Sequence, residues 1–210
     1  MPGSGEMFSG LEGRFGAILA DPPWRFGNRS ARLTPELRRL ERGRTMTVGE
    51  IAALPAAGLA APRCHLYLWC PNALLPEGLE VMRAWGFGYK THLVWYKVRK
   101  DGGPDARGAG FYFRTATELL LFGVRGRLRT LAAAQRQVNL IASRKLPQAR
   151  KPEVIYGLIE RCSPGPYCEL FGRRPVAGWS RWDGAASARG ATRPRARLAA
   201  AGAWLFPPPP

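Results

Sequence analysis

The chain has 210 residues, of which 46% are hydrophobic and 22% charged, a composition typical of a folded globular protein that excludes full disorder. No apolar run approaches the ~20 residues needed to cross a membrane, and residues 1–11 lack the apolar core of a signal peptide, so we expect a cytoplasmic protein without a membrane partner. Lys and Arg outnumber Asp and Glu by 32 to 15, and the net charge of +17 favours a polyanionic partner, most often nucleic acid.

Strands and helices are predicted to alternate along most of the chain. Apolar runs that end at Pro or Gly predict strands, and a Thr47/Glu50 capping box and Pro152 mark helix starts. The expected elements, in order, are a strand at 15–20, a loop at 25–44, a helix from Thr47 to about Pro55, a strand at 65–69, a helix at 74–85, a strand at 90–97, a Gly-rich loop at 101–110, a strand at 117–124, a short strand at 137–141, a helix from Pro152 to about Arg161, a turn at 163–166 and a strand at 167–171.

This order predicts an α/β fold with a mostly parallel sheet. We expect a flexible N-terminus at residues 1–12 and one folded domain at residues 13–184. Residues 185–210 hold four Arg, no acidic residue and a terminal run of four Pro, so they are expected to be a disordered basic tail.

The four cysteines form two sequence pairs, Cys64 with Cys70 and Cys162 with Cys168, each with five residues between its members. Structural zinc sites usually have two to four residues there, and only two histidines are present. We therefore expect ordinary buried thiols and no metal site.

The sequence Asp21-Pro22-Pro23-Trp24 follows the first predicted strand, and ligands bind at the carboxyl ends of such strands in open α/β sheets. A carboxylate can accept a hydrogen bond from an amine, two prolines hold the backbone and its carbonyls in place, and an indole offers a face for a base. Together, these residue types would hold an exocyclic amine on a planar ring. The alternative is a strand end with a proline turn and a core Trp.

Residues 20–25, Ala-Asp-Pro-Pro-Trp-Arg, resemble the opening of the DPPW adenine-N6 methyltransferase family, which includes the eukaryotic mRNA adenosine methyltransferase catalytic subunit and short bacterial and phage enzymes. The resemblance covers residues 14–184 in order. It continues through Thr45-Met46, Leu66-Tyr-Leu-Trp69, Trp85-Gly-Phe-Gly-Tyr-Lys90, Val94-Trp-Tyr-Lys97, Arg150-Lys-Pro-Glu153, Tyr156-Gly-Leu-Ile-Glu-Arg161, Ser163-Pro-Gly-Pro166 and Glu169-Leu-Phe-Gly-Arg173.

The resemblance implies a Rossmann-like methyltransferase fold in permuted order, with the catalytic motif first and the main cofactor strand last, and S-adenosylmethionine as methyl donor. By position in the matching motifs, it assigns the donor to Lys151, Glu169, Phe171, Gly172 and Arg173. The chain contains neither a GxGxxG dinucleotide motif nor a P-loop.

The resemblance also implies a mechanism for the catalytic set Asp21, Pro22, Pro23 and Trp24. Adenine leaves its stack and enters the pocket. Asp21 and the Pro22 carbonyl would accept the two amine hydrogens while Trp24 stacks on the ring, and the methyl group would pass by direct displacement.

Basic residues flank this motif on both sides. Residues 25–44 hold seven Arg against two Glu, and residues 119–152 hold eight basic residues and no acid, which suits a phosphate backbone. The expected substrate-binding residues are Arg25, Arg44, Trp95, Lys97, Arg114 and Glu118. A structural salt bridge for Glu118 and a core position for Trp95 are the alternatives, and the aromatic run at 111–113 could either pack or stack on bases.

Two departures from the family leave alternatives open. Gly43-Arg44 stand where relatives often carry a Tyr, and Gly184 stands where relatives carry an Asn that meets the donor ribose. We expect methylation of adenine in DNA, with the same reaction on RNA, or a catalytically degenerate nucleic-acid-binding homologue, as alternatives. A homodimer would help so small a chain to grip a duplex.

Overall fold

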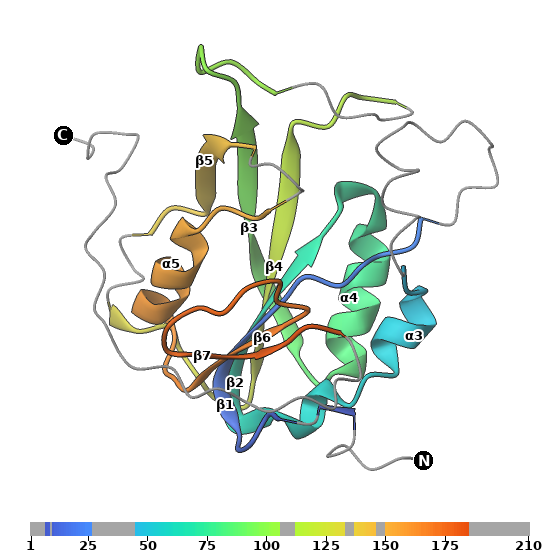
Figure 1. Cartoon of the computed structure of the whole chain (residues 1–210), viewed down its shortest axis with the longest axis vertical. Helices are drawn as coiled ribbons and strands as arrows, with labels where there is room; N and C mark the ends of the chain where they lie inside the picture. Colours follow the sequence, from blue (N-terminus) through green and yellow to red (C-terminus); the bar gives the residue numbers. More distant parts are fainter. Residues whose placement is uncertain are drawn as a thin grey trace.

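The computed structural model describes residues 7–8, 10–26, 45–105, 112–132, 137–145 and 150–184. Expectations for residues 1–6, most of the loop at 25–44 and the tail at 185–210 lie outside the described residues. The described chain forms one sheet with helices on both of its faces, which confirms the α/β prediction (Figure 1).

The expected elements are largely present, with longer strands than the sequence predicted. Thr47 caps helix α3 (Val48–Ala52), and its reciprocal contacts with Glu50 confirm the predicted capping box (Figure 1). The elements are β1 (Phe15–Ala20), α3 (Val48–Ala52), η1 (Ala56–Gly58), β2 (Ala60–Cys70), η2 (Asn72–Leu74), α4 (Leu75–Ala84), β3 (Gly88–Val98), β4 (Thr117–Arg125), β5 (Leu140–Arg144), α5 (Val154–Cys162), β6 (Tyr167–Leu170) and β7 (Trp179–Trp182).

The seven strands lie in the order β5-β3-β4-β2-β1-β6-β7. All neighbouring pairs are parallel except those of β4, which runs antiparallel to both β2 and β3. This reversal matters for the site, because it brings the amino end of β4 to the edge where the other strands have their carboxyl ends.

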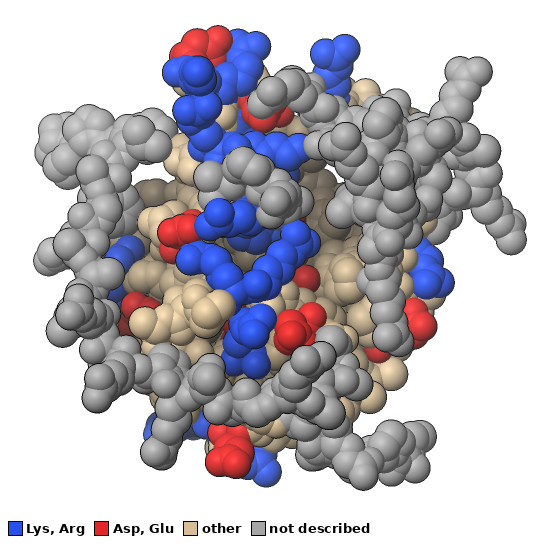
Figure 2. Space-filling model, viewed as in Figure 1, with Lys and Arg blue, Asp and Glu red and all other residues tan. Residues whose placement is uncertain are grey.

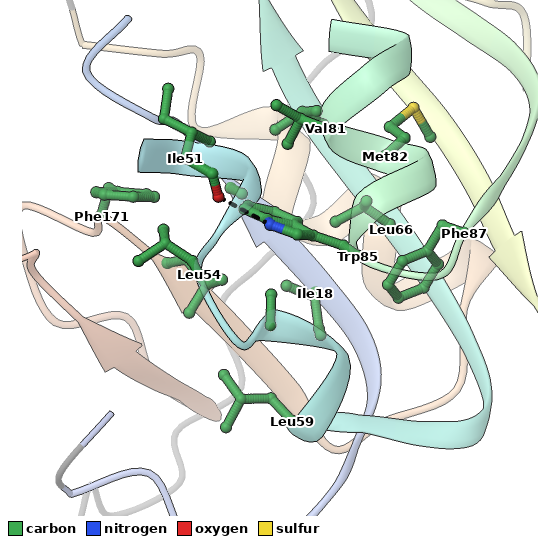
Figure 3. Close-up of a cluster of buried hydrophobic side chains, with 14 of the residues drawn as sticks. Ile18, Ile51, Leu54, Leu59, Leu66, Val81, Met82, Trp85, Phe87 and Phe171 are labelled. Atoms are coloured by element: carbon green, nitrogen blue, oxygen red, sulfur yellow. Dashed lines mark hydrogen bonds between the residues drawn. The ribbon is translucent and has the colours of Figure 1, made fainter. Parts of the chain in front are cut away.

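The core has two halves, one on each face of the sheet. In β1, Ile18 and Ala20 point into the cluster formed with α3 and α4, whereas Ala17 and Leu19 point into the cluster under α5. Figure 3 shows the first cluster, in which Trp85 lies among aliphatic side chains and its indole N–H donates to the Ile51 carbonyl at 3.0 Å. Burial on both faces explains why β1 is a continuous apolar run.

Two strands differ from the sequence predictions. β5 lies three residues later than the expected strand at 137–141, and β7 was not anticipated. β7 has only four residues, Trp-Ser-Arg-Trp, with buried Trp at its ends and exposed residues between them. So short a segment carries almost no periodic signal, and its pairing with β6 makes it a strand.

Away from the site, a buried polar cluster joins β2 to the turn before β6. Ser163 Oγ lies 2.9 Å from His65 Nδ1 and 2.8 Å from the Tyr67 hydroxyl, and all three residues are buried. The four cysteines are free and buried, and burial raises the pKa of the Cys64 and Cys70 thiols to about 12. None of the helices in the described ranges is long and apolar enough to cross a membrane.

Candidate active site

Asp21 directly follows β1, an inner strand, so it lies at the carboxyl edge of the sheet. Its backbone N–H donates to the Leu170 carbonyl of neighbouring β6 at 3.3 Å. The two prolines that follow cannot donate to a ladder, which ends the strand at this point.

The proline segment is held by residues that lie outside the regular sheet. Met46 N–H donates to the Pro23 carbonyl at 2.8 Å, and Arg25 N–H donates to the Met46 carbonyl at 2.9 Å. The Arg25 guanidinium also bonds the Thr45 side chain and carbonyl, at 3.2 and 3.1 Å. These bonds hold the backbone that follows Asp21 against residues 45–46.

Trp24 lies in a different environment from the one expected of a stacking surface. Its side chain belongs to the core, with 7% exposed, and its indole N–H donates to the Trp69 carbonyl at 2.9 Å. Its backbone N–H donates to the Pro22 carbonyl at 2.9 Å. In this arrangement Trp24 anchors the Asp21–Pro23 segment to the end of β2 and leaves little ring area for a base.

Asp21 and three other charged side chains form a row of alternating charge. Lys151 Nζ lies 3.1 Å from Asp21 Oδ1 and also bonds Glu118 Oε1. Glu118 Oε2 lies 2.9 Å from Lys97 Nζ. The order Asp21–Lys151–Glu118–Lys97, which we call the ion chain, thus alternates carboxylate and ammonium groups, and each of the four side chains is at least four-fifths buried.

The topology explains why residues so distant in sequence meet. Glu118 is the second residue of antiparallel β4 and pairs with Trp95 of β3, two residues before Lys97. Lys151 directly precedes Pro152 at the approach to α5, and its ammonium lies over the Trp69 ring, 5.1 Å from the centroid. Lys97 lies over the Trp95 ring in the same way, at 4.7 Å.

The two carboxyl groups of the ion chain have pKa values shifted in opposite directions. Burial raises the pKa of the Asp21 carboxyl above its ordinary value, and the opposing effect of Lys151 does not offset it. Burial acts in the same direction on Glu118, but Lys151 and Lys97 outweigh it and hold the pKa of that carboxyl below its usual range. Burial opposes the charge of Lys151, yet the two carboxylates raise its pKa. At neutral pH, Glu118 is thus the better satisfied carboxylate of the two.

A third carboxylate, Glu169, lies in β6 next to Asp21. It is 8% exposed and accepts a hydrogen bond from the Tyr156 hydroxyl at 3.0 Å. Burial is the main cause that raises its pKa, and the negative charge of Asp21 adds to it. A positively charged group between these two carboxylates would relieve both.

The chain turns sharply after β6. Phe171 has a left-handed backbone, with φ at +65°, and Gly172 is so closely packed that a Cβ there would lie 2.7 Å from both Glu169 Oε2 and Arg181 Cγ. Gly184 also has a positive φ of +84°, and a Cβ there would meet the Phe171 ring at 3.1 Å. The family Asn position is therefore next to Phe171.

The structure brings five of the predicted charged residues together at one edge. Asp21, Lys97, Glu118, Lys151 and Glu169 converge there, and Arg173 lies close enough for its charge to lower the pKa of Asp21. Trp95 is 2% exposed, with its indole N–H on Ser143 Oγ at 2.9 Å, which places it in the core beneath Lys97. Arg114 is exposed between β3 and β4, Phe171 is buried against Trp182, and Arg44 is outside the described residues.

Sequence reasoning did not select three residues that build this edge. Trp69 lies under Lys151 and accepts the Trp24 indole N–H through its carbonyl, Tyr156 donates to Glu169, and Met46 holds the proline segment. Each lies within a motif that resembled the family, but only the three-dimensional contacts show what it supports.

Comparisons with known proteins identify a family and several relatives of this chain. The sequence profile of the MT-A70 family matches residues 15–184. The type II methyltransferase M.MunI of a Mycoplasma species is 24% identical over 185 residues, which cover 80% of this chain and 76% of that protein.

Two animal relatives are much longer than this chain. The human N(6)-adenosine-methyltransferase catalytic subunit METTL3 is 29% identical over 166 residues, which cover 77% of this chain and 26% of that protein. The N(6)-adenosine-methyltransferase MT-A70-like protein of Drosophila melanogaster is 29% identical over 163 residues, which cover 77% of this chain and 25% of that protein. The chain therefore spans about a quarter of the length of these two relatives.

Proposed function

The chain belongs to the MT-A70 family of S-adenosylmethionine-dependent N6-adenine methyltransferases, and we propose that it methylates the N6 amine of adenine in DNA. The observation that carries the proposal is the Asp21 carboxylate, held at the carboxyl edge of the sheet and joined through Lys151 to Glu118. A planar amine needs acceptors in a fixed direction, and this arrangement supplies one on a rigid support.

On the substrate side, Asp21 accepts one hydrogen of the adenine amine. Lys151 engages Oδ1, and a carboxylate has acceptor positions on both oxygens, so Oδ2 can serve the amine. The Pro22 carbonyl already accepts the Trp24 N–H and can accept a second hydrogen bond. Together the two acceptors orient the nitrogen and increase its electron density, which favours attack on an electrophile.

On the donor side, the residues present fit S-adenosylmethionine. That cofactor, when bound, supplies an electrophilic methyl group on a positively charged sulfonium. Asp21 and Glu169 are buried carboxylates with raised pKa values, which a nearby cation would stabilise in the charged form. Lys151 and Arg173 offer positive charge to the carboxylate of the cofactor, and Gly172 is the residue that leaves room for the Glu169 carboxylate beside it.

The proposal of DNA over RNA rests on how much of each relative the similarity covers. The similarity covers three quarters of the type II methyltransferase M.MunI but only a quarter of the N(6)-adenosine-methyltransferase catalytic subunit METTL3. The chain's net charge of +17 suits either polymer. RNA is therefore the second candidate, and a direct comparison of substrates decides between them.

The test offers the purified chain labelled S-adenosylmethionine with double-stranded DNA, single-stranded DNA or RNA, followed by digestion and mass spectrometry. We expect N6-methyladenine in DNA, and its loss in Asp21→Ala with nucleic-acid binding nearly unchanged. A variant that keeps most of its activity would remove Asp21 from the mechanism. No product in any polymer, together with no donor binding, would favour the degenerate binding homologue.

A further inference from the structure

Two large aromatic side chains project into solvent beside the candidate active site. Tyr112 is 94% exposed and Phe113 is 87% exposed, whereas Tyr89, the next most exposed ring among the described residues, is 41% exposed. An exposed Arg, Arg114, follows them directly. Two consecutive apolar rings left in water are costly for a folded domain and indicate a surface that is covered in the functional complex.

The segment that carries these rings is fixed to the ion chain at its base. Lys97 N–H donates to the Ala116 carbonyl at 2.8 Å, and Asn72 Nδ2 donates to Thr117 Oγ1 at 2.8 Å. Asp105 N–H donates to the Lys97 carbonyl at 2.7 Å, so the stretch that leaves β3 is also held at Lys97. The chain thus leaves the sheet after Val98 and rejoins it at Thr117, each one residue away from a member of the ion chain, at the upper ends of β3 and β4 (Figure 1).

The distance along the chain limits where the rings can act. Phe113 is five residues from Glu118, and an extended chain covers at most about 3.6 Å per residue, so its Cα lies within roughly 18 Å of that of Glu118. Nucleotides in one strand of a duplex rise by about 3.4 Å each. The rings are thus within reach of the first few nucleotides on either side of an adenine at Asp21.

Positive charge surrounds the same edge of the sheet. A hollow of about 460 Å³ at the ends of β3 and β5 is lined by four basic residues, Arg99, Lys100, Arg144 and Lys145, together with Val98 and Asp101. Figure 2 shows Lys and Arg gathered in a band on this face, with acidic side chains at several places along its margins. Exposed rings next to such a band suit a chain of bases on a phosphate backbone better than an apolar protein partner.

We propose that Tyr112 and Phe113 stack on bases next to the target adenine, while the basic hollow holds the backbone of the same strand. Extruding a base leaves its neighbours without a stacking partner, and aromatic side chains can take the place of the missing base. The inference rests on the proposed function, because it assigns these rings to the polymer whose adenine is methylated.

The test uses the full chain and DNA of mixed sequence. The double variant Tyr112→Ala/Phe113→Ala is expected to lower kcat/KM about five- to a hundredfold, whereas Tyr112→Phe keeps most of the activity. Tyr89→Ala is the matched control, because Tyr89 is an exposed ring at the start of β3, at the other end of that strand. In parallel, wild-type protein is irradiated with DNA containing 5-iododeoxyuridine, and the cross-linked residues are mapped by mass spectrometry.

Cross-links at Tyr112 or Phe113, together with the expected loss in the double variant but not in Tyr89→Ala, would support the proposal. Wild-type activity in the double variant with cross-links elsewhere would overturn it. If the wild type forms no N6-methyladenine in any polymer yet still cross-links at these rings, the stacking surface stands and the proposed reaction fails.

Discussion

Lys151 Nζ lies between two carboxylates from different strands, 3.1 Å from Asp21 Oδ1 and hydrogen-bonded to Glu118 Oε1. These carboxylates have opposite pKa shifts, raised at Asp21 and lowered at Glu118. Glu118 has a second lysine, Lys97, whereas Asp21 shares its edge with the negative Glu118 and Glu169. Glu118 thus has two ammonium partners, whereas Asp21 shares one of them, which leaves Asp21 Oδ2 to accept a hydrogen bond from a ligand.

We expect Asp21→Asn to abolish methyl transfer and, at pH 7, to raise the melting temperature. Folding raises the pKa of Asp21, so the folded state favours the uncharged form more than the unfolded chain does. The stabilising contribution of protonation is complete at low pH and lost as pH rises through the folded pKa. The variant should therefore be more stable than the wild type at pH 7, and the gap should close towards pH 4. Thermal unfolding from pH 4 to 8 measures this, and a variant less stable at neutral pH would contradict it.

Glu118→Gln, in the same ion chain, should change stability with the opposite pH dependence. Its pKa is lowered in the folded state, so its stabilising contribution is present above the ordinary value of 4.5 and lost as pH falls through the folded pKa. We expect a loss of about 1–3 kcal/mol in the free energy of unfolding at pH 7, as for other buried charged hydrogen bonds. The loss should shrink in acid. Denaturant unfolding of the variant and the wild type at pH 7 and pH 3.5 measures the loss of stability at each pH. Asp21→Asn, for which the opposite pH dependence is expected, is the paired comparison.

Gly172→Ala should impair donor binding. The added Cβ would lie 2.7 Å from Glu169 Oε2 and Arg181 Cγ, so it would displace the carboxylate we assign to the donor. We expect at least tenfold weaker binding of S-adenosylmethionine by calorimetry. Gly49→Ala is the control, because nothing lies within 4 Å of its Cβ position on α3, and it should be neutral or slightly stabilising. Equal donor affinity in both variants would place the donor elsewhere.

The basic hollow predicts a change in salt dependence. Replacing Arg144 and Lys145 by Ala should weaken DNA binding and reduce the slope of log affinity against log salt by about one for each phosphate that is no longer neutralised. The double variant Arg83→Ala/Lys90→Ala removes the same charge from α4 and the start of β3, at the opposite end of that strand from the hollow. Fluorescence anisotropy between 50 and 300 mM salt compares the two, and identical slopes would exclude the hollow from the interface.

The buried polar cluster of His65, Tyr67 and Ser163 should affect stability and leave methyl transfer unchanged. Ser163→Ala would leave His65 and Tyr67 without their shared partner in a buried site, at a cost of about 1–3 kcal/mol. Burial lowers the pKa of His65, so the unfolded chain binds its proton more readily, and wild-type stability should decrease as pH falls below 6.5. Chemical denaturation at pH 7.5 and 5.5 tests both points, with exposed Ser180→Ala as the control.

Local patterns in the sequence were sufficient for much of this protein. The apolar run of β1, the capping box at Thr47 and the position of Asp21 at a strand end all follow from interactions between residues close in the chain. The motif resemblance to the family, covering residues 14–184, agrees closely with the profile match at 15–184. These features are determined locally, because periodicity, capping and proline geometry depend on only a few neighbouring residues.

Long-range pairing decided the rest. The reversed direction of β4 places Glu118 beside Lys97 and Lys151, and the pairing with β6 turns four residues around Trp179 into β7. The sequence determined that Trp24 follows the two prolines, but the position of its indole against the Trp69 carbonyl depends on how β2 lies next to β1. Register and strand direction are set by the total burial on both faces of the sheet, so no local window of the sequence contains them.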